Sequence, residues 1–572
     1  MEEIVRIDDL PPAPEPSLEH MFPAMKEGKA AGLTGRQLVD LVQTETGTGQ
    51  FLSPAAAAIG NSRVPATVNI IAARGVDIDG DEALPYFRRV GAEPSHPLKR
   101  QSLDGAWWEQ HIPRGALSAN EMGMLTKLSA ADTVLAWNDA NAFCVAKGVP
   151  LVIEPGFRKF NSALQVGNGV RVMGLDRNFT RFISTAPAGA HAVVVGGPDA
   201  AHRQGGGIEN MTILHNDVAT GGPGKGTTAA KGVMVRNTAR NMGVLRNVGI
   251  WGFGAVGLEL DGDFTLDRFD DVKIIQCAQS GSAQANAGLV MNSGLTPYAI
   301  HFHGLSIEES GFFGIDYASS AYGGAVFGYM GATRKGSITF DESCVIQGNF
   351  GQAMVYLEGF GLVRLDAYLE LTDVDQSGEA ATVSPQFLAS ITNSKVDIGG
   401  NYRGSERSLS AVNRALSITG GSYVELRGGL DDGDFVGTAE VKGSILRIPR
   451  SKQLNAGTVS GDDTSAVLTG DHAAKARFST GSAPAIVTPS ENIKSITRAA
   501  AGTYDVEFKR PLKPGWQGFA NAEDLAATGP LSASVRHTWS GTADAGCSVY
   551  THAVDLLTDF NTMDLIVFGE FA

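Results

Sequence analysis

A short strand-like run recurs along the middle of this 572-residue sequence and constrains the fold more than any other feature. Each run is bounded by glycine or asparagine and returns after roughly 23 to 39 residues, a period typical of solenoids and propellers. No tryptophan signature of four-stranded propeller blades is present, so we predict an all-β, right-handed parallel β-helix. The runs are NMTILHN from Asn210, NVGIWGFG from Asn247, DVKIIQC from Asp271, GLSIEES from Gly304, SCVIQGN from Ser343, DAYLELTD from Asp366, SKVDIGGNY from Ser394 and SYVELRGG from Ser422.

Composition agrees with this fold and excludes several classes of function. The 71 glycines show no collagen period, and they indicate the many turns that an all-β chain needs. A net charge of −15 argues against nucleic acid as a partner. The four cysteines have no metal-ligand spacing, so we expect neither a metal site nor a disulfide framework, and no cofactor is indicated. The acidic, proline-rich start is unlike a signal peptide, and no apolar run reaches the ~18 residues of a membrane helix, so we expect synthesis in a cytoplasm without membrane insertion.

Changes in periodicity divide the chain into four predicted domains. Residues 1–60 are an acidic arm with short helices, because apolar residues recur at helical spacing over 22–43. Residues 61–115 are a mixed entry module. Residues 116–455 are the β-helix, which opens with a helix over 129–148 that Ser129 or Asp132 would cap and Gly148 would end. Residues 456–572 are a C-terminal β-sandwich, with a hairpin turning at 499–502.

Three stretches of the sequence carry a resemblance to a known family. The segment ATVNIIAARGVDIDGDEALPYFRRVGAEPSHPLKRQSLDGAWWEQ (66–110) resembles the entry module that precedes a pectate-lyase-like β-helix in phage tail fibres and tailspikes. PLVIEPGFRKFNSALQVGNGVRVMGLDR is similar to the opening of that helix, whereas the family's common Asp-Gly-x-x-Asp-Asp-Thr stretch is missing here. NIKSITRAAAGTYDVEF and the final DLIVFG resemble a tail-fibre terminal domain.

The resemblance implies a location and a set of partners. It implies a homotrimer in the virion tail that attaches to tail or baseplate proteins through its N-terminus. Such a protein binds, and often cleaves, a bacterial capsular or exopolysaccharide at the cell surface. A receptor-binding fibre of the same fold without catalytic activity is the alternative, because a fold does not fix a function.

The stretch HFHGLSIEESGFFG, residues 301–314, concentrates residues with catalytic chemistry. His301 and His303 are two residues apart, so on a strand both face the same side. Two histidines suit substrate contact or proton transfer, but they also occur as solvated residues, and a metal site would need a third ligand.

Glutamates in three of the runs are predicted to share one outer face. If Leu305 and Ile307 point inward, Glu308 points outward, and the same reasoning places Gln347 and Glu370 outside. Coils stacked in register would put these three residues in one column, with the two glutamates roughly 10 Å apart because neighbouring strands lie about 4.8 Å apart. A column of solvated polar residues is the alternative reading.

Two chemistries fit a polysaccharide depolymerase of this kind. Hydrolysis needs paired carboxyl groups. Elimination from a uronic acid needs a base such as tyrosine or histidine and a cation or donors for the sugar carboxylate, and we favour it because such residues gather over 298–335. The predicted catalytic residues are Glu308, His303, Glu309, Tyr317 and Glu370. The predicted substrate-binding residues are His301, Tyr322, Arg334, Lys335, Gln347, Tyr368 and Asp373.

Overall fold

The computed structural model describes residues 56–448 and, further out, the strands within 21–53 and 459–568. The main gaps in residues 56–448 are 76–84, 198–205, 220–227, 281–285, 312–322, 348–352, 371–386, 404–413 and 432–436, and there are shorter ones. The chain divides into two compact units, Met1–Phe253 and Gly254–Ala572.

The first unit begins with an antiparallel strand pair, β1 (Met21–Lys26) and β2 (Lys29–Thr34). The predicted short helices are therefore wrong over these residues. Lys26 pairs with Lys29, and the two residues between them in the sequence are Glu27 and Gly28. Cross-strand pairing overrides the apolar spacing that suggested helices. Residues 35–43 of the same prediction lie outside the described residues.

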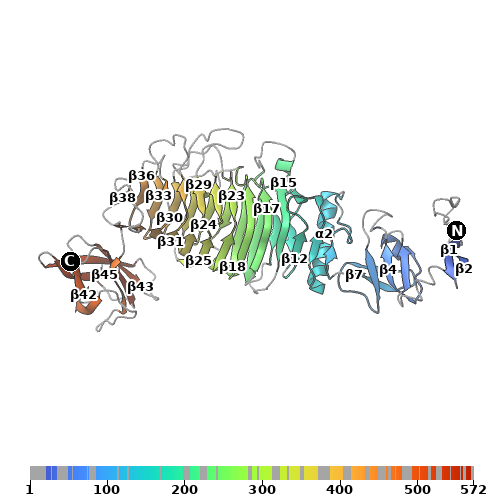
Figure 1. Ribbon diagram of the computed structural model, residues 1–572, viewed down its shortest axis with the longest axis horizontal. Helices are drawn as coiled ribbons and strands as arrows, with labels where there is room; N and C mark the ends of the chain where they lie inside the picture. Colours follow the sequence, from blue (N-terminus) through green and yellow to red (C-terminus); the bar gives the residue numbers. More distant parts are fainter. Residues whose placement is uncertain are drawn as a thin grey trace. The chain divides into compact units, whose positions relative to one another are not determined.

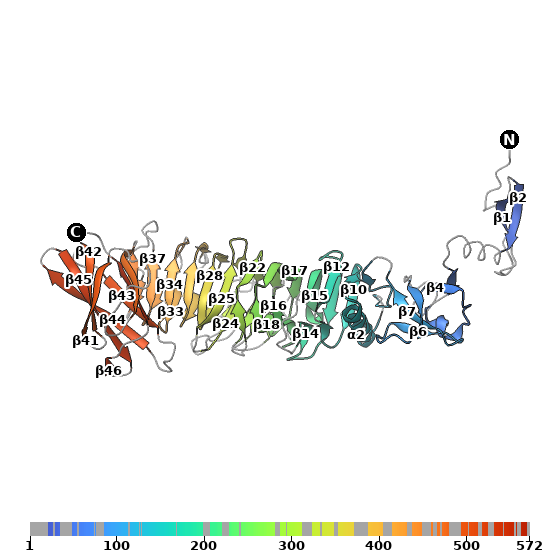
Figure 2. The ribbon, with the colours of Figure 1, turned by 90° about the horizontal axis from the view of Figure 1, so that it is seen from below.

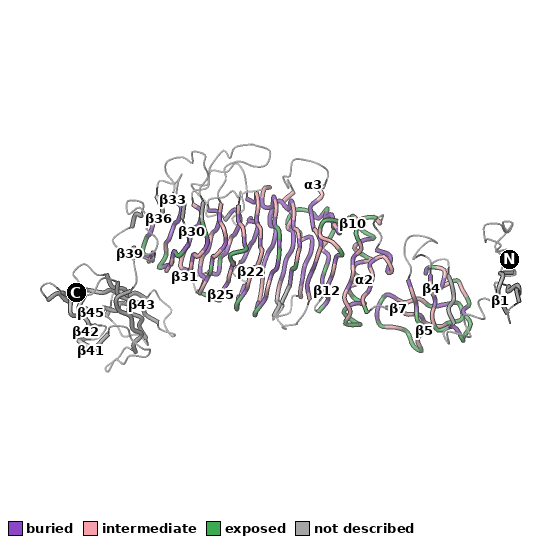
Figure 3. Tube along the Cα trace, in the orientation of Figure 1, coloured by how far each residue is buried: buried purple, intermediate pink, exposed green. Residues whose placement is uncertain are grey.

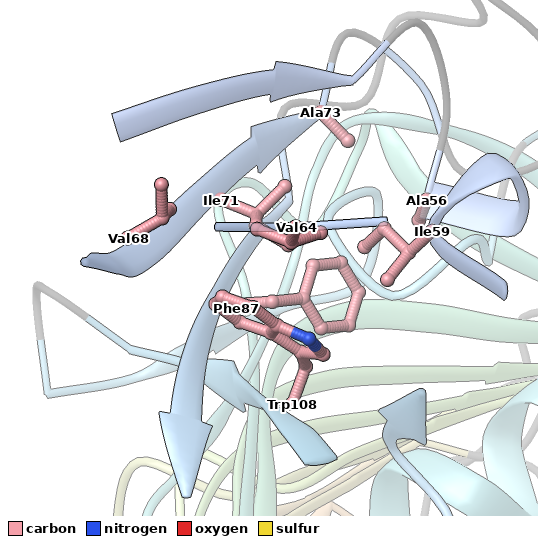
Figure 4. Close-up of a cluster of buried hydrophobic side chains, with 8 residues drawn as sticks. All are labelled: Ala56, Ile59, Val64, Val68, Ile71, Ala73, Phe87 and Trp108. Atoms are coloured by element: carbon pink, nitrogen blue, oxygen red, sulfur yellow. The ribbon is translucent and has the colours of Figure 1, made fainter. Parts of the chain in front are cut away.

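The entry module is a five-stranded sheet around a small core. Its strands pair in the order β3-β4-β5-β7-β6, and a short 3-10 helix, η2, packs beside them. Trp108 and Phe87 are buried at its centre (Figure 4). The Trp108 indole N–H donates to Ser102 Oγ at 3.0 Å, and the Arg89 guanidinium covers the ring. The elements are β3 (Gly49–Ser53), η2 (Ala56–Asn61), β4 (Val68–Ala73), β5 (Tyr86–Val90), β6 (Lys99–Gln101) and β7 (Trp107–His111).

Helix α2 (Ala130–Lys147) confirms the predicted helix and packs against the first coil of the β-helix. Ser129 is the N-cap, and its hydroxyl accepts the backbone N–H of Asp132. Gly148 ends the helix in the left-handed conformation, with φ of 66°. The Trp137 indole N–H donates to Gln165 O at 2.6 Å, which ties the helix to a strand of that coil.

Beyond α2, the first unit contains parallel coils. One sheet holds most of the strands and a second sheet holds β11, β14 and β16. The first set is β8 (Leu117–Ser118), β9 (Leu151–Ile153), β10 (Gly156–Phe160), β12 (Arg171–Gly174), β13 (Thr180–Ser184), β15 (Gly207–His215) and β17 (Met242–Trp251), and the one-turn helix α3 (Asn216–Ala219) follows β15. The second is β11 (Leu164–Val166), β14 (His191–Val195) and β16 (Lys231–Ala239).

Most coils of the second unit consist of three strands, and the coils appear side by side in Figures 1 and 2. The first two strands of a coil pair in parallel with their equivalents in the next coil, and the third does so in another sheet. The first sheet contains β19 (Arg268–Ile275), β22 (Ile300–His303), β23 (Ser306–Glu308), β25 (Lys335–Phe340), β26 (Val345–Gln347), β28 (Phe360–Leu365), β29 (Tyr368–Glu370), β31 (Lys395–Ile398), β32 (Tyr402–Arg403), β34 (Tyr423–Leu426), β35 (Leu430–Asp431), β37 (Ile445–Ile448) and β39 (Ala466–Thr469). The other contains β18 (Val256–Thr265), β20 (Ala287–Met291), β24 (Gly323–Tyr329), β27 (Ala353–Glu358), β30 (Phe387–Thr392), β33 (Arg414–Thr419), β36 (Gly437–Val441) and β38 (Val459–Gly461), and β21 (Thr296–Tyr298) pairs with β18. This is a parallel β-helix, as predicted.

Inward rows of apolar side chains hold these coils together. Burial alternates along strands such as β22 and β34, whereas β20 is buried throughout. Figure 3 maps the buried and exposed residues along the chain. The rings of Phe269, Phe302 and Phe340 stack on consecutive coils with centroids 4.9 Å apart. Leu305 and Ile307 are buried as predicted, and burying such a side chain stabilises a fold by about 1.5–3 kcal/mol.

The corner between β22 and β23 requires glycine. Gly304 has φ of 65°, and a Cβ at this position would lie 2.5 Å from Asp271 Oδ1 of the preceding coil. The chain therefore turns between His303 and Ser306, so that two short strands follow one another within nine residues.

The C-terminal part forms two antiparallel sheets, with strand orders β40-β47-β43 and β41-β42-β45-β44, and β46 pairs with β45. Their strands are β40 (His472–Ser479), β41 (Ile493–Ala500), β42 (Thr503–Leu512), β43 (Gln517–Glu523), β44 (Leu531–Ser540), β45 (Ala543–Ala553), β46 (Leu556–Leu557) and β47 (Thr562–Phe568). Strands β41 and β42 are the predicted hairpin, with Ala500 paired to Thr503. Within the described residues, no helix has both the length and the hydropathy to cross a membrane.

Candidate functional site

The predicted column of polar residues lies in the first sheet of the second unit. Glu308 pairs with Gln347, and Gln347 pairs with Glu370, so the expected register is confirmed. All three side chains are half-buried, while Ile307, Ile346 and Leu369 beside them are buried. The Ser306 hydroxyl donates to Glu308 Oε1 at 2.5 Å, which fixes that carboxylate against its own strand. With strands about 4.8 Å apart, Glu308 and Glu370 lie close to the expected spacing.

Tyr368 lies beside this column, and Glu309 directly follows Glu308 in the chain. Tyr368 pairs with Val345 one coil earlier and is two residues from Glu370 on the same strand. Glu309 has φ of 49°, and its carboxylate accepts the Gln276 side-chain amide at 2.9 Å. Tyr317, Tyr322 and Asp373, also predicted for the site, lie outside the described residues.

Arg334 and Lys335 lie at the start of β25, away from the histidines. Thr339, four residues after Lys335, is the partner of His301, so about 13 Å of strand separates the lysine backbone from that position. The Arg334 guanidinium donates to Asn393 O at 3.2 Å and to Gly421 O. Burial lowers the pKa of Arg334. These contacts tie the corners of three coils together, so the structure does not bring Arg334 to the other predicted site residues.

His301 and His303 face outward from β22, and both contact a carboxylate that the sequence prediction did not include. His303 Nδ1 lies 2.5 Å from Asp341 Oδ2, and His301 Nε2 lies 3.5 Å from the same oxygen. The backbone N–H and the hydroxyl of Ser343 donate to Asp341 Oδ1 at 3.0 and 2.5 Å. The His303 side chain is 44% exposed, so a substrate can reach it.

Asp341 stays ionised over a wide range of pH. Burial alone would raise the pKa of its carboxyl group, but the hydrogen bonds from Ser343 and His303 outweigh that effect and lower the pKa to about 2. A permanent negative charge therefore lies against the His303 ring.

A second carboxyl group, Asp366, follows in the next coil. Phe340 pairs with Leu365, and Asp366 N donates to Phe340 O at 2.9 Å, so Asp366 occupies the position that Asp341 has one coil earlier. Burial raises the pKa of Asp366, although Arg427 opposes the shift. Arg427 lies 3.9 Å from Asp366 Oδ1 and makes two bonds of 2.5 Å to Asp397.

The sequence contains a signal for these carboxyl groups. ITFDES and VRLDAY both place an aspartate directly after the last inward residue of a strand, at the same position of successive coils. Reading the turn that follows each strand, as well as the outward strand positions, would have found Asp341 and Asp366. The predicted site residues include neither Asp341 nor Asp366.

Two arginines lie in the same row as His301, one on the preceding strand and one two strands further on. His301 pairs with Arg268 in the preceding coil and with Thr339 in the following one, and Thr339 pairs in turn with Arg364. Arg268 also donates to Asp270 Oδ1 at 2.5 Å. The surface therefore combines an exposed imidazole, an ionised carboxylate, a second carboxyl group of raised pKa and arginines, which suits proton transfer on an anionic substrate. Within the described part of the chain, no group of three or more acidic, histidine or cysteine residues has the arrangement of a metal site.

No protein-family model matches the sequence, and no curated protein matches it. Among solved structures, the chain is similar to the enzymatically active domain of tailspike protein 4 from bacteriophage CBA120, with 10% identity, 95% of this chain and 79% of that chain covered, and a TM-score of 0.43. It is also similar to ORF18 of Geobacillus virus E2, with 12% identity, 90% and 92% covered, and a TM-score of 0.40.

A third similar structure is WceF of Pantoea stewartii, described as a glycan biofilm modifying enzyme with a bacteriophage tailspike-like parallel β-helix fold. The identity is 11%, the coverage 91% of this chain and 70% of that chain, and the TM-score 0.36. At such identities and scores, no residue's role is transferred from these proteins. The strand pairing of this chain shows by itself that it is a parallel β-helix, the architecture named in that description.

Proposed function

We propose that this chain is a phage tailspike that binds a bacterial capsular or exopolysaccharide and depolymerises it. The proposal places it in the virion tail as a homotrimer, attached to tail or baseplate proteins through its N-terminus and active at the bacterial cell surface. The observation that carries catalysis is the exposed His303 imidazole with the ionised Asp341 carboxylate 2.5 Å from its Nδ1. An imidazole in that setting is suited to removing a proton from a bound sugar.

Elimination from an acidic polysaccharide is the first candidate reaction. His303 Nε2 takes the C5 proton of a uronic acid, the electron pair forms the C4–C5 double bond, and the bond from C4 to the glycosidic oxygen breaks. The leaving oxygen takes a proton from water. Arg268, on the strand before His301, and Arg364, two strands after it, supply positive charge for the sugar carboxylate.

Hydrolysis is the second candidate, and the pair Asp341 and Asp366 favours it. The two residues occupy equivalent positions on adjacent coils, about 4.8 Å apart along the stack. Retaining glycosidases use carboxyl groups about 5–5.5 Å apart, and the two groups must differ in proton affinity. The pKa of Asp341 is lowered and that of Asp366 is raised, as such a division of roles requires.

Viscosity of host polysaccharide tests the proposal. A depolymerase lowers the viscosity, whereas binding without a fall in viscosity would support the receptor-binding fibre instead. Ultraviolet absorbance of a 4,5-unsaturated uronate identifies elimination, and new reducing ends without that absorbance identify hydrolysis. His303→Ala should abolish the absorbance, because the proposed base is lost, and unchanged activity in this variant would refute the assignment.

A further inference from the structure

The two oxygens of the Asp341 carboxylate have different partners. Oδ1 accepts two hydrogen bonds from Ser343, one from the backbone N–H and one from the hydroxyl. Oδ2 faces the imidazoles, at 2.5 Å from His303 Nδ1 and 3.5 Å from His301 Nε2. Ser343 is held in turn by Gly304, whose N–H donates to its hydroxyl at 2.7 Å. The orientation of the carboxylate is therefore fixed by the turn in which it lies.

This arrangement determines which nitrogen of His303 carries the proton. An ionised carboxylate has no hydrogen to donate, so the short contact requires Nδ1 to be the donor. A neutral imidazole has only one N–H group. With the proton on Nδ1, the lone pair is on Nε2, the nitrogen that remains for a substrate.

We propose that Asp341, oriented by Ser343, is the positioning residue that sets the tautomer and ring orientation of His303 so that Nε2 is the proton acceptor. The role rests on the proposed function, in which His303 is the base. The proposal adds that His303 needs Asp341 in order to accept a proton at Nε2. In a serine–histidine–aspartate triad, loss of the correct tautomer costs about 10⁴-fold in rate, so the effect is large where a histidine depends on such a partner.

Asp341→Asn is a sharp test because the surroundings dictate the orientation of the introduced amide. The amide has one oxygen, and the two donors of Ser343 retain that oxygen on the Oδ1 side. Its NH₂ group must then face His303 Nδ1, which becomes the acceptor, and the ring proton moves to Nε2. We expect depolymerisation to fall by about 10²–10⁴-fold.

A readout besides activity separates positioning from general damage. Diethylpyrocarbonate modifies an imidazole nitrogen that has an accessible lone pair, and mass spectrometry of peptides from the full chain measures the rate at each histidine. His303 should react readily in the natural protein and at least about tenfold more slowly in Asp341→Asn, with His191 as the internal reference. Asp341→Glu, which retains an accepting carboxylate, should restore most of the rate.

Controls make each outcome decisive. Glu358→Gln converts a half-buried carboxylate on β27 that accepts the Tyr356 hydroxyl, and it should leave both activity and His303 reactivity unchanged. Equal His303 reactivity in the natural protein and in folded Asp341→Asn would overturn the proposal. If Asp341→Asn melts early, Ser343→Ala replaces it. The Ser343 hydroxyl donates to Asp341 Oδ1 at 2.5 Å and lies 3.2 Å from His303 Nδ1, so its loss loosens the orientation of both the carboxylate and the ring and should slow the reaction of His303. An unchanged rate would again overturn the proposal. If no polysaccharide is cleaved at all, the proposed function fails, whereas the diethylpyrocarbonate rates still decide the role of Asp341.

Discussion

Ile307 and Glu308 are neighbours on β23 with opposite surroundings, and exchanging each for a polar residue should have opposite effects. Ile307 is fully buried, and a Cβ added at Gly288 would lie 2.8 Å from its Cγ2 atom, so the side chain packs directly against β20 of the opposite sheet. Glu308 is half-buried on the outer face and bonded to the Ser306 hydroxyl.

The expected cost of Ile307→Asp follows from these contacts. Removal of the buried aliphatic side chain costs about 2–5 kcal/mol, and an uncompensated carboxylate in the interior adds several kcal/mol more. The sum approaches the whole free energy of unfolding of a typical domain, about 5–15 kcal/mol. Because a solenoid is stabilised by contacts between neighbouring repeats, the loss should open the coils next to β23 first.

Glu308→Gln should change the free energy of unfolding by less than about 1 kcal/mol, since the amide oxygen still accepts the Ser306 hydroxyl. If Glu308 takes part in proton transfer, the same change should lower activity by about 10²–10⁴-fold. Ile307→Val is the matched control for packing and should cost only about 0.5–1.5 kcal/mol.

Urea denaturation followed by circular dichroism measures these free energies, and hydrogen exchange of the peptide 300–311 locates the opening. The reasoning would be refuted if Ile307→Asp unfolded at the same urea concentration as the natural chain. It would also be refuted if Glu308→Gln were the more destabilising of the two substitutions. Full activity of both Glu308→Gln and His303→Ala would mean that this stretch is only the polar edge of a coil.

Three further predictions concern single groups. The folded pKa of Asp341, about 2, lies below the ordinary value of about 3.9. The ionised carboxylate therefore stabilises the fold above about pH 4, and this stabilisation is lost as the pH falls to about 2. The difference in melting temperature between the natural chain and Asp341→Asn should shrink between about pH 4 and pH 2. Burial raises the pKa of the Cys144 and Cys344 thiols to about 12, so both should resist alkylation at neutral pH until the chain unfolds, and labelling of the native protein would contradict their burial. Arg334→Ala should cost about 0.5–1.5 kcal/mol in urea denaturation, because the carbonyl groups of Asn393 and Gly421 lose their donor, and an unchanged midpoint would show that these hydrogen bonds contribute nothing.

Part of the candidate site was predictable because its order is local. Alternation along a strand determines which side chain faces outward, so Glu308, Gln347 and Glu370 were placed correctly from their buried neighbours alone. Their common column followed from equivalent positions in successive runs. The caps of α2 were predictable for the same reason, since Ser129 and Gly148 act within one turn of the helix.

Contacts between coils were decided only by the tertiary structure. His303 and Asp341 are 38 residues apart, and Arg334 reaches a carbonyl 87 residues away. The coils differ in length. For this reason, the contacts between the turn of one coil and the residues of the next coil cannot be read from their spacing in the sequence. Parallel strand pairing fixes that register.

The hairpin of β1 and β2 is a second case in which pairing between strands, and not local spacing, decided the structure. The apolar spacing of this segment favours short helices. Pairing between the two strands stabilises the extended conformation instead, and periodicity carries no information about that pairing. The repeat, the inward rows and the outward face could be predicted from the sequence, because each depends on residues a few positions apart. The chemistry of that face, an imidazole against an ionised carboxylate, arose only when coil stacking brought distant turns together.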